Sequence, residues 1–228
     1  MKEHDLYKKM KSIEAEYLKP HEFQQFKNYW LTKEIVQEST NVLSFGVHRD
    51  VGWEQAMCDL NPNLNIHCFD PTPDSVTLFE TDFRHKEKMT FHNVAYMDKK
   101  GKMKFYFNKN DLSKCYSLLP LPQLGGDAYI EVDADNLTNI MAEHMPKVDI
   151  IKADIEGVWY EICREILDNN IDFKAFLIEF EVKLIDNEES ILRYENLLKE
   201  FKEKGYKLYL NRPRNKILSE AIILKDYV

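Results

Sequence analysis

The stretch VDIIKADIEG, residues 148–157, is an apolar run that ends in two acids and a glycine. A short β-branched run bounded by glycine is typical of a buried strand in a parallel sheet. Asp154 and Glu156 would then lie beyond the carboxyl end of that strand, where open α/β sheets bind their ligands. Burying acids beside an apolar strand costs free energy unless something uses them. The pattern leaves two interpretations, a ligand site or a cap for the helix expected from Val158.

A second motif, NVLSFGVHRDVG at residues 41–52, has the form of a strand, a tight loop and the start of a helix. Gly46 follows the strand directly, which permits the turn and lets a ligand approach the backbone. The next predicted strand, residues 65–69, ends in Asp70, which lies 24 positions after Gly46. This is close to the spacing at which an acid after the second strand meets ribose hydroxyls. The two motifs therefore predict the two halves of one nucleoside-binding site.

Composition limits the possible classes of protein. A chain of 228 residues that is 44% hydrophobic can bury the core of one α/β domain. Its net charge of −8 argues against a nucleic-acid-binding face. Its four cysteines show no C-x-x-C spacing, which argues against a cysteine zinc site or a disulfide framework. No apolar run reaches membrane length. We expect a cytoplasmic protein that binds neither nucleic acid nor membrane.

Two regions are expected along the chain. Residues 1–40 predict two helices that form a helical N-terminal extension, because apolar residues recur there at helical spacing. These helices would cover the domain, and a homodimer face or a lid are the alternatives. Residues 41–228 alternate strands with helices, which is typical of a doubly wound α/β sheet. Residues 206–210 and 217–224 would close that sheet as a final pair of strands, and residues 108–127 would form a long loop over the ligand.

The order of these motifs resembles that of class I S-adenosylmethionine-dependent methyltransferases and, within them, the FkbM family. The match covers roughly residues 41–224, and its most specific part is KADIEG at 152–157, similar to the family's K-x-D-x-E-G signature. Its other parts are SFG at 44–46 with Gly52, CFDP at 68–71, NVA at 93–95 with Asp98 and Gly101, and YIEVD at 129–133. The resemblance implies a Rossmann-like class I methyltransferase sheet, mostly parallel, with an antiparallel C-terminal strand.

The resemblance also implies S-adenosylmethionine as the cofactor. Gly46 and its neighbours would pass beneath the methionine part, Asp70 would hold the ribose hydroxyls, and Asp154 would face the cofactor's amino group or the acceptor. The full set of cofactor-binding residues expected on this basis is Gly46, Val47, Gly52, Asp70, Pro71, Asn93, Val94 and Asp154. The sequence departs from the family pattern in its glycine-poor first loop, where His48, Arg49 and Asp50 stand, and in Trp159 after the E-G pair.

Methyl transfer mainly requires alignment of the acceptor, and a hydroxyl acceptor also needs a base. Asp154 and Glu156 are the candidate catalytic residues, because neighbouring carboxylates raise each other's pKa toward neutrality. The same acids could hold a divalent metal, but no third ligand is evident from spacing, so we assign no metal ligands. We expect methylation of a small-molecule or saccharide acceptor, most simply at oxygen.

Two other functions stay open at this stage. One is a non-catalytic module that keeps the nucleoside-cofactor pocket without turnover, and the other is an NAD-dependent oxidoreductase. The first loop lacks the G-x-G-x-x-G pattern, which disfavours the oxidoreductase. His67 and His92 are expected to pack against helices, and His144 to interact with the carbonyls at a helix end.

Overall fold

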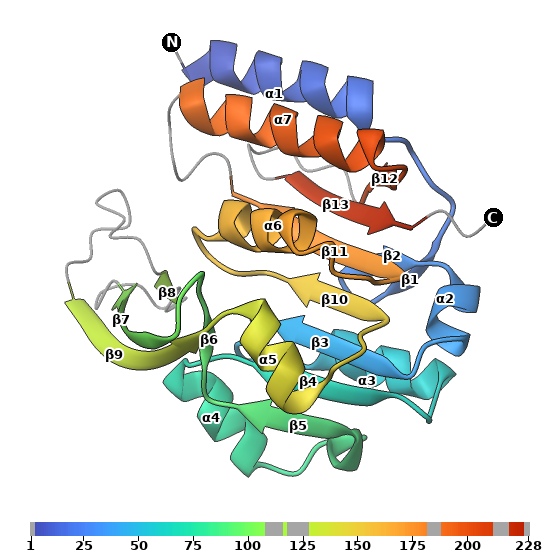
Figure 1. Ribbon diagram of the computed structural model, residues 1–228. Coiled ribbons are helices and arrows are strands. Elements are labelled where there is room, and N and C mark those ends of the chain that lie inside the picture. Colours follow the sequence, from blue (N-terminus) through green and yellow to red (C-terminus); the bar gives the residue numbers. More distant parts are fainter. Residues whose placement is uncertain (1–2, 108–115, 118–127, 182–187, 212–218, 226–228) are drawn as a thin grey trace.

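The computed structural model describes residues 3–107, 116–117, 128–181, 188–211 and 219–225. A seven-stranded sheet with helices on both faces forms the body of the molecule, and a four-stranded sheet projects from one end of it (Figure 1). The strands of the seven-stranded sheet, in spatial order, are β12 (Lys207–Leu210), β13 (Ser219–Leu224), β11 (Ala175–Phe180), β10 (Ile150–Ala153), β3 (Asn41–Phe45), β4 (Asn65–Phe69) and β5 (Met89–His92).

The seven-stranded sheet has the predicted doubly wound, mostly parallel topology. Strands β3, β4, β5, β10 and β11 pair in parallel, and only β13 runs antiparallel to its neighbours β11 and β12. The expected antiparallel C-terminal strand is therefore confirmed. Along the chain, the first strand of this sheet is β3, and β4 and β5 are added on one side of it. The chain then crosses to β10, which lies on the other side of β3. The order of strands reverses between β3 and β10, which is the place where such sheets bind ligands.

Apolar side chains on both faces of the sheet anchor the covering helices. One face packs against α1 (Glu3–Tyr17), α5 (Leu137–His144), α6 (Trp159–Asp168) and α7 (Glu188–Glu203). The other packs against α2 (Lys33–Gln37), α3 (Gly52–Leu60) and α4 (Pro73–Glu80). Strands β10 and β11 are buried at every position, as the unbroken apolar runs in their sequences predict.

The smaller sheet has the order β6-β9-β7-β8 and consists of β6 (Ala95–Tyr96), β9 (Ala128–Asp135), β7 (Gly101–Phe107) and β8 (Tyr116–Ser117). It lies beyond the carboxyl ends of β3 and β10 (Figure 1). The sequence predicts one continuous strand over 89–96, but Asn93 and Val94 interrupt it, so that β5 and β6 join different sheets. Of the loop expected over 108–127, only β8 lies within the described residues.

The prediction of a second N-terminal helix that includes residues 24–31 is wrong. Residues 24–31 instead form a hairpin of β1 (Gln24–Phe26) and β2 (Tyr29–Leu31), followed by the short helix α2. The first helix, α1, is confirmed and lies beside α7 (Figure 1). Its apolar side chains Leu6, Met10 and Ile13 are buried in the core of the same chain. The division into an extension of residues 1–40 and a domain of residues 41–228 stays a prediction.

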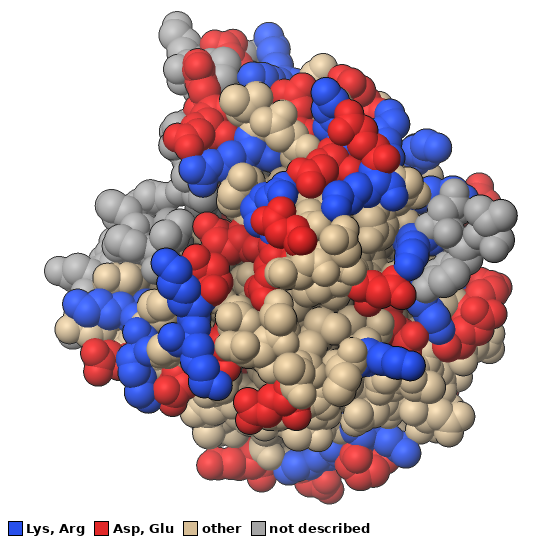
Figure 2. All heavy atoms as spheres, viewed as in Figure 1, with Lys and Arg blue, Asp and Glu red and all other residues tan. Residues whose placement is uncertain are grey.

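Helix ends follow the local sequence. Thr72 caps α4 through its hydroxyl, with Pro73 in the first turn, and Gly205 ends α7 with a positive φ of 88°. The 3-10 helix η1 (Lys86–Lys88) leads into β5. Among the described residues no helix has the length and apolar character to cross a membrane. Acidic and basic side chains are interspersed on the face shown in Figure 2. One such pair joins Lys102 of β7 to Asp133 of β9.

Candidate active site

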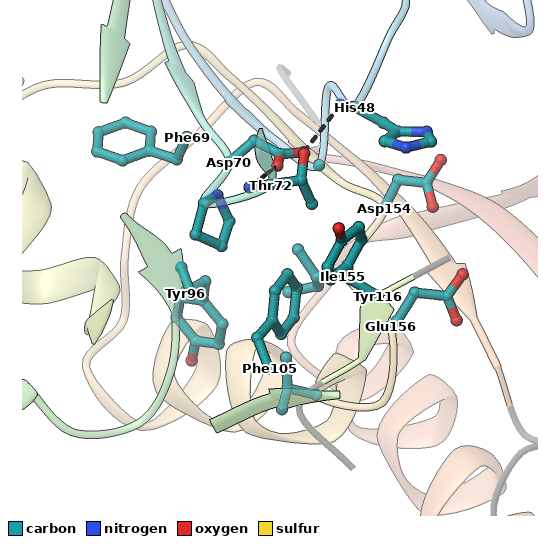
Figure 3. A pocket seen from close by; sticks show the side chains of 14 residues that line it. His48, Phe69, Asp70, Thr72, Tyr96, Phe105, Tyr116, Asp154, Ile155 and Glu156 are labelled. Carbon is teal, nitrogen blue, oxygen red and sulfur yellow. Dashed lines mark hydrogen bonds between the residues drawn. The ribbon is translucent and has the colours of Figure 1, made fainter. Parts of the chain in front are cut away.

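A cavity of about 260 Å³ lies between the carboxyl ends of β3, β4 and β10 and the smaller sheet. The large sheet contributes Asp70 and Asp154 to its lining, and the smaller sheet contributes Tyr96, Phe105 and Tyr116 (Figure 3). The acids come from the large sheet, which also contributes the ring of Phe69, and the smaller sheet contributes aromatic rings alone to the labelled lining. This is the position predicted from the two motifs, and it coincides with the reversal of strand order between β3 and β10.

Gly46 is required by the neighbouring strand. It has a φ of 78°, and a Cβ atom on it would lie 1.8 Å from the backbone oxygen of Asp154. Its N–H donates to the carbonyl of Phe69 over 3.0 Å, and its carbonyl accepts from Lys152 Nζ over 3.0 Å. The glycine thus lets the ends of β3, β4 and β10 meet at one point, a reason for glycine that adds to the turn and the ligand approach expected from the sequence.

Asp70 fixes the loop after β3. Its carboxylate accepts the backbone N–H of His48 and that of Thr72, each over 2.8 Å, and the residue is 4% exposed. His48 is held in the left-handed region with a φ of 45°, and its carbonyl accepts from Ser75 Oγ over 2.7 Å. A carboxylate has about four acceptor positions, so Asp70 keeps capacity for ligand hydroxyls.

The lining fits a nucleoside cofactor. His48 Nε2 is buried and has no hydrogen-bond partner among the described residues, and Asp74 Oδ2 lies 3.7 Å from it. A buried polar atom without a partner is costly, and a polar ligand group in the cavity would relieve that cost. Asp70 offers acceptors for a ribose, and the rings of Tyr96 and Phe105 offer flat apolar surface. These features are the donor, acceptor and apolar contacts that such a cofactor needs.

Asp154 follows β10 directly and is oriented by Tyr29 of the hairpin. The Tyr29 hydroxyl donates to Asp154 Oδ2 over 2.9 Å, and Tyr29 is 5% exposed. Burial, together with the negative charge of Asp154, raises the pKa of Tyr29 well above its ordinary value. Tyr29 therefore stays protonated and acts as a fixed donor. The second Asp154 oxygen is not engaged by this bond.

Glu156 lies two residues after Asp154 and interacts with a third acid. Burial raises its pKa, and its carboxyl is hydrogen-bonded to that of Glu181. Glu181 is 3% exposed and accepts the N–H of Gly157 over 2.5 Å. Burial and the contact with Glu156 raise the pKa of Glu181 well above its ordinary value. Burial and the closeness of the two carboxyl groups therefore favour the protonated form of one of them.

Asp154 and Glu156 do not cap the helix that follows. Helix α6 has Val158 at its N-cap, and no side chain there accepts a hydrogen bond. The helix-cap interpretation is therefore wrong, and both acids line the cavity instead. Figure 3 shows the two carboxylates on the same side of the cavity, each from the segment that follows β10.

The predicted site residues divide into two groups. Gly46, Asp70, Pro71, Asp154 and Glu156 all line the one cavity. The remaining predicted cofactor residues, Val47, Gly52, Asn93 and Val94, are not among its lining residues. For this second group a role in cofactor binding stays a prediction.

The four predicted cofactor residues outside the cavity lining differ in their surroundings. Val47 is buried in the apolar cluster on the α3 side of the sheet, and the N–H of Gly52 donates to Asp50 Oδ1 over 2.7 Å. Val94 packs partly buried against the opposite cluster, and Asn93 is exposed between β5 and β6.

Several residues of the site have no recognisable pattern in the sequence. Tyr29 was assigned to a helix, so its contact with Asp154 could not be anticipated. Tyr96 and Phe105 enter the cavity from a second sheet that was not predicted. Glu181 had a weak signal, because the alternation in EFE at 179–181 places a second acid at the end of β11, adjacent to β10.

Comparisons with known proteins place the sequence in context. The family described as "Methyltransferase FkbM domain" matches residues 21–208. No curated protein matches the chain. Solved structures with similarity include the fibrillarin pre-rRNA processing protein of Methanococcus jannaschii, at 11% identity and a TM-score of 0.49, with 83% of this chain and 68% of that chain covered.

Two further structures are similar over most of this chain. Aeropyrum pernix fibrillarin in complex with S-adenosyl-L-methionine is 13% identical, with a TM-score of 0.47, and the match covers 82% of this chain and 66% of that one. An O-methyltransferase family protein from Burkholderia thailandensis is 9% identical, with a TM-score of 0.44, and the match covers 84% of this chain and 52% of that one.

Proposed function

The chain belongs to the FkbM methyltransferase domain family and is an S-adenosylmethionine-dependent methyltransferase, and from this premise we propose that it methylates a hydroxyl oxygen of a small-molecule or saccharide acceptor. The observation that carries the proposal is the pair of carboxylates from Asp154 and Glu156 on one side of the cavity. A methylated hydroxyl must lose its proton, and these acids are placed to accept it.

S-adenosylmethionine supplies a methyl group that its sulfonium already activates. We propose that Gly46, His48 and Asp70 bind the cofactor, with Asp70 accepting from ribose hydroxyls and His48 Nε2 meeting a polar group. Asp154 is held in one orientation by Tyr29, so that its other oxygen can accept the acceptor's hydroxyl proton. This arrangement supports alignment of the acceptor, which is the main requirement for methyl transfer.

Glu156 has a different part in the proposal. Because its pKa is raised by burial, its carboxylate is a stronger base than an exposed one. A proton shared with Glu181, whose pKa is also raised, would compete with a divalent metal for the same oxygens. We therefore propose proton transfer by the acids themselves, and a metal at Asp154 and Glu156 stays the secondary alternative.

Ligand binding tests the cofactor assignment. Isothermal titration calorimetry with S-adenosylmethionine, S-adenosylhomocysteine and NAD⁺ should give binding of the first two and none of the third. Binding of NAD⁺ alone would contradict the proposal. Transfer of a labelled methyl group to a panel of hydroxyl-bearing compounds, with saccharides among them, then tests the acceptor, and NMR of the product shows whether the methyl group is on oxygen or nitrogen.

Asp154→Asn separates a catalytic role from a structural one. The amide oxygen still accepts from Tyr29, so fold and cofactor binding should be kept, while turnover should fall by a factor on the order of 10²–10⁴, the scale for loss of a general base. The control is Asp82→Asn, an exposed acid between α4 and η1, which should change neither quantity. Unchanged turnover of Asp154→Asn together with a lower melting temperature would demote Asp154 to a structural residue.

A further inference from the structure

Three histidines from separate segments meet on the face of the large sheet that α5 covers. His67 lies on β4, His92 ends β5 and His144 ends α5. Each offers a ring nitrogen, and these three atoms all lie within 4.8 Å of one another. The three residues are partly buried, and together we call them the histidine cluster. It is the one group of at least three potential metal ligands within such distances among the residues that the structure describes.

The fold itself brings the cluster together. His67 and Phe69 are two positions apart on β4 and so point to the same face of the sheet. Phe69 pairs with His92 in the parallel register of β4 and β5, and α5 lies across this face (Figure 1). The His92 ring stacks on Phe69 with centroids 4.4 Å apart and an angle of 9°, and His144 lies 4.3 Å from His92. The rings are therefore held in place before any ligand binds.

The nitrogen atoms have the spacing of metal ligands. His92 Nε2 lies 2.9 Å from His67 Nδ1. A zinc ion with bonds of about 2.0–2.1 Å separates two tetrahedral nitrogen ligands by roughly 3.3 Å. Closing the cluster around an ion thus needs small side-chain shifts and no change of backbone. The carboxylate of Glu143 lies 3.8 Å from His144 Nε2 and adds a negative charge beside the cluster.

We propose that His67, His92 and His144 form a binding site for a divalent transition-metal ion of the zinc and cobalt class. Imidazole nitrogen suits these ions, whereas magnesium and calcium prefer oxygen ligands. Three protein ligands leave the fourth tetrahedral position for water or an added ligand. The ion would join α5 to the edge of the sheet beside Phe69, which stacks on His92 and also lines the cavity.

This site is separate from Asp154 and Glu156 and does not depend on the proposed methyl transfer. Its residues were expected only to pack against helices or to interact with a helix end. The cysteine pattern, which argued against a zinc site, does not bear on a site made of histidines alone. The nearest alternative is a simple stack of aromatic rings in which one proton joins His67 to His92.

Cobalt binding distinguishes these two possibilities. The purified protein is freed of metal with a chelator and titrated with Co²⁺ and Zn²⁺ by calorimetry, and with Co²⁺ by visible absorption. We expect one ion per chain and the visible bands of tetrahedral cobalt. His92→Phe and His144→Phe keep a ring for stacking but remove a ligand, and each should weaken binding by more than about tenfold. Mg²⁺ should not compete.

The matched control is His85→Asn. His85 is outside the cluster, contacts Asp59 and has a φ of 63°, which asparagine tolerates. This variant should bind Co²⁺ as the unchanged protein does. Circular dichroism of the metal-free variants shows whether they are folded, and His67→Phe is a third test if one of the others is not.

Three outcomes would overturn the proposal. The first is the absence of stoichiometric Co²⁺ binding. The second is equal affinity in folded His92→Phe and His144→Phe. The third is an intense near-ultraviolet thiolate band, which would place the ion at one of the four cysteines instead.

Discussion

Gly46 shows how one residue joins three strands, and it gives the first prediction. Gly46→Ala should lower the free energy of unfolding by roughly 3 kcal/mol or more, because the added Cβ meets backbone that side-chain motion cannot clear. Gly205→Ala has a similar φ of 88° but open space around the Cβ position, and it should cost about 1–2 kcal/mol. Urea denaturation of both variants measures the difference, which reports the contact with Asp154.

Gly101→Ala completes this series as a control. Nothing lies within 4 Å of its Cβ position, and its φ is not positive. We expect a change within about 0.5 kcal/mol, as for other open surface positions. Equal losses for Gly46→Ala and Gly205→Ala would mean that φ alone, and not the approach of β10, requires glycine after β3.

The acid pair of Glu156 and Glu181 predicts a pH dependence of stability. Burial raises both pKa values in the folded state, so the folded protein binds more protons than the unfolded chain above the ordinary glutamate pKa of about 4.3. By linkage, the stabilising contribution of this pair is present at low pH and is lost as pH rises through the folded pKa values. Stability should therefore decline with rising pH on account of this pair.

Glu181→Gln tests this direction. The amide can still accept from Gly157 and donate to Glu156, but it does not titrate. Urea denaturation from pH 5 to pH 8 should show the variant gaining stability relative to the unchanged protein as pH rises. Phe180→Leu at the end of β11, next to Glu181, lowers stability without removing a carboxyl, and its curve should run parallel to that of the unchanged protein. A parallel curve for Glu181→Gln would contradict the shared proton.

At the scale of elements, the sequence predicted those parts whose pattern is local. Strands β3, β4, β10 and β11 are short apolar runs next to glycine or acids, and all were predicted. The hairpin β1–β2 was not, because its aromatic residues recur at a spacing that also fits a helix. Pairing of Phe26 with Tyr29 across a two-residue turn decides between the two, and Lys27 in that turn has a φ of 55°. Counting apolar residues at helical spacing does not detect cross-strand pairing of this kind.

Helix α1 provides a prediction about how the N-terminal residues are stabilised. Met10 is fully buried between α1 and the core that includes α7, so Met10→Ala should cost about 2–5 kcal/mol. The contact lies within one chain, so the urea midpoint should not depend on protein concentration. Leu192→Ala on α7 is the control, since Leu192 is 51% exposed and its loss should change stability by less than about 0.5 kcal/mol.

A concentration-dependent midpoint would instead support the homodimer through the N-terminal helices that the sequence left open. Association adds a bimolecular term to stability, so dilution would then lower the midpoint. The apolar side of α1 is already used inside the chain, and a dimer would need another part of its surface.

At the scale of the whole molecule, the site is formed where two sheets meet, and this explains what could be predicted of it. Asp70 and Asp154 end strands that are adjacent through β3, so their meeting follows from the topology of a doubly wound sheet. Tyr96, Phe105 and Tyr116 come from the smaller sheet, whose mixed pairing joins distant segments. The alternation over 102–107 predicts the strand β7, but no local pattern shows that it pairs in a second sheet. The turn at Gly46 was predicted and Gly46 lines the cavity, but its close approach to β10 was not predicted, because that contact depends on tertiary structure alone.

The meeting of the two sheets gives the last prediction. S-adenosylhomocysteine, the cofactor product, should contact both sheets when it fills the cavity. Its binding should therefore slow amide hydrogen exchange in both sheets. S-adenosylhomocysteine at about 100 times its Kd should add roughly 2.7 kcal/mol to the free energy of unfolding. Amide hydrogens of residues 46–50, 70–72 and 154–158 should exchange more slowly, and so should those of β7 and β9 beyond the cavity. Protection limited to the large sheet would mean that the smaller sheet does not contact the ligand, and that Phe105 and Tyr116 are not part of its site.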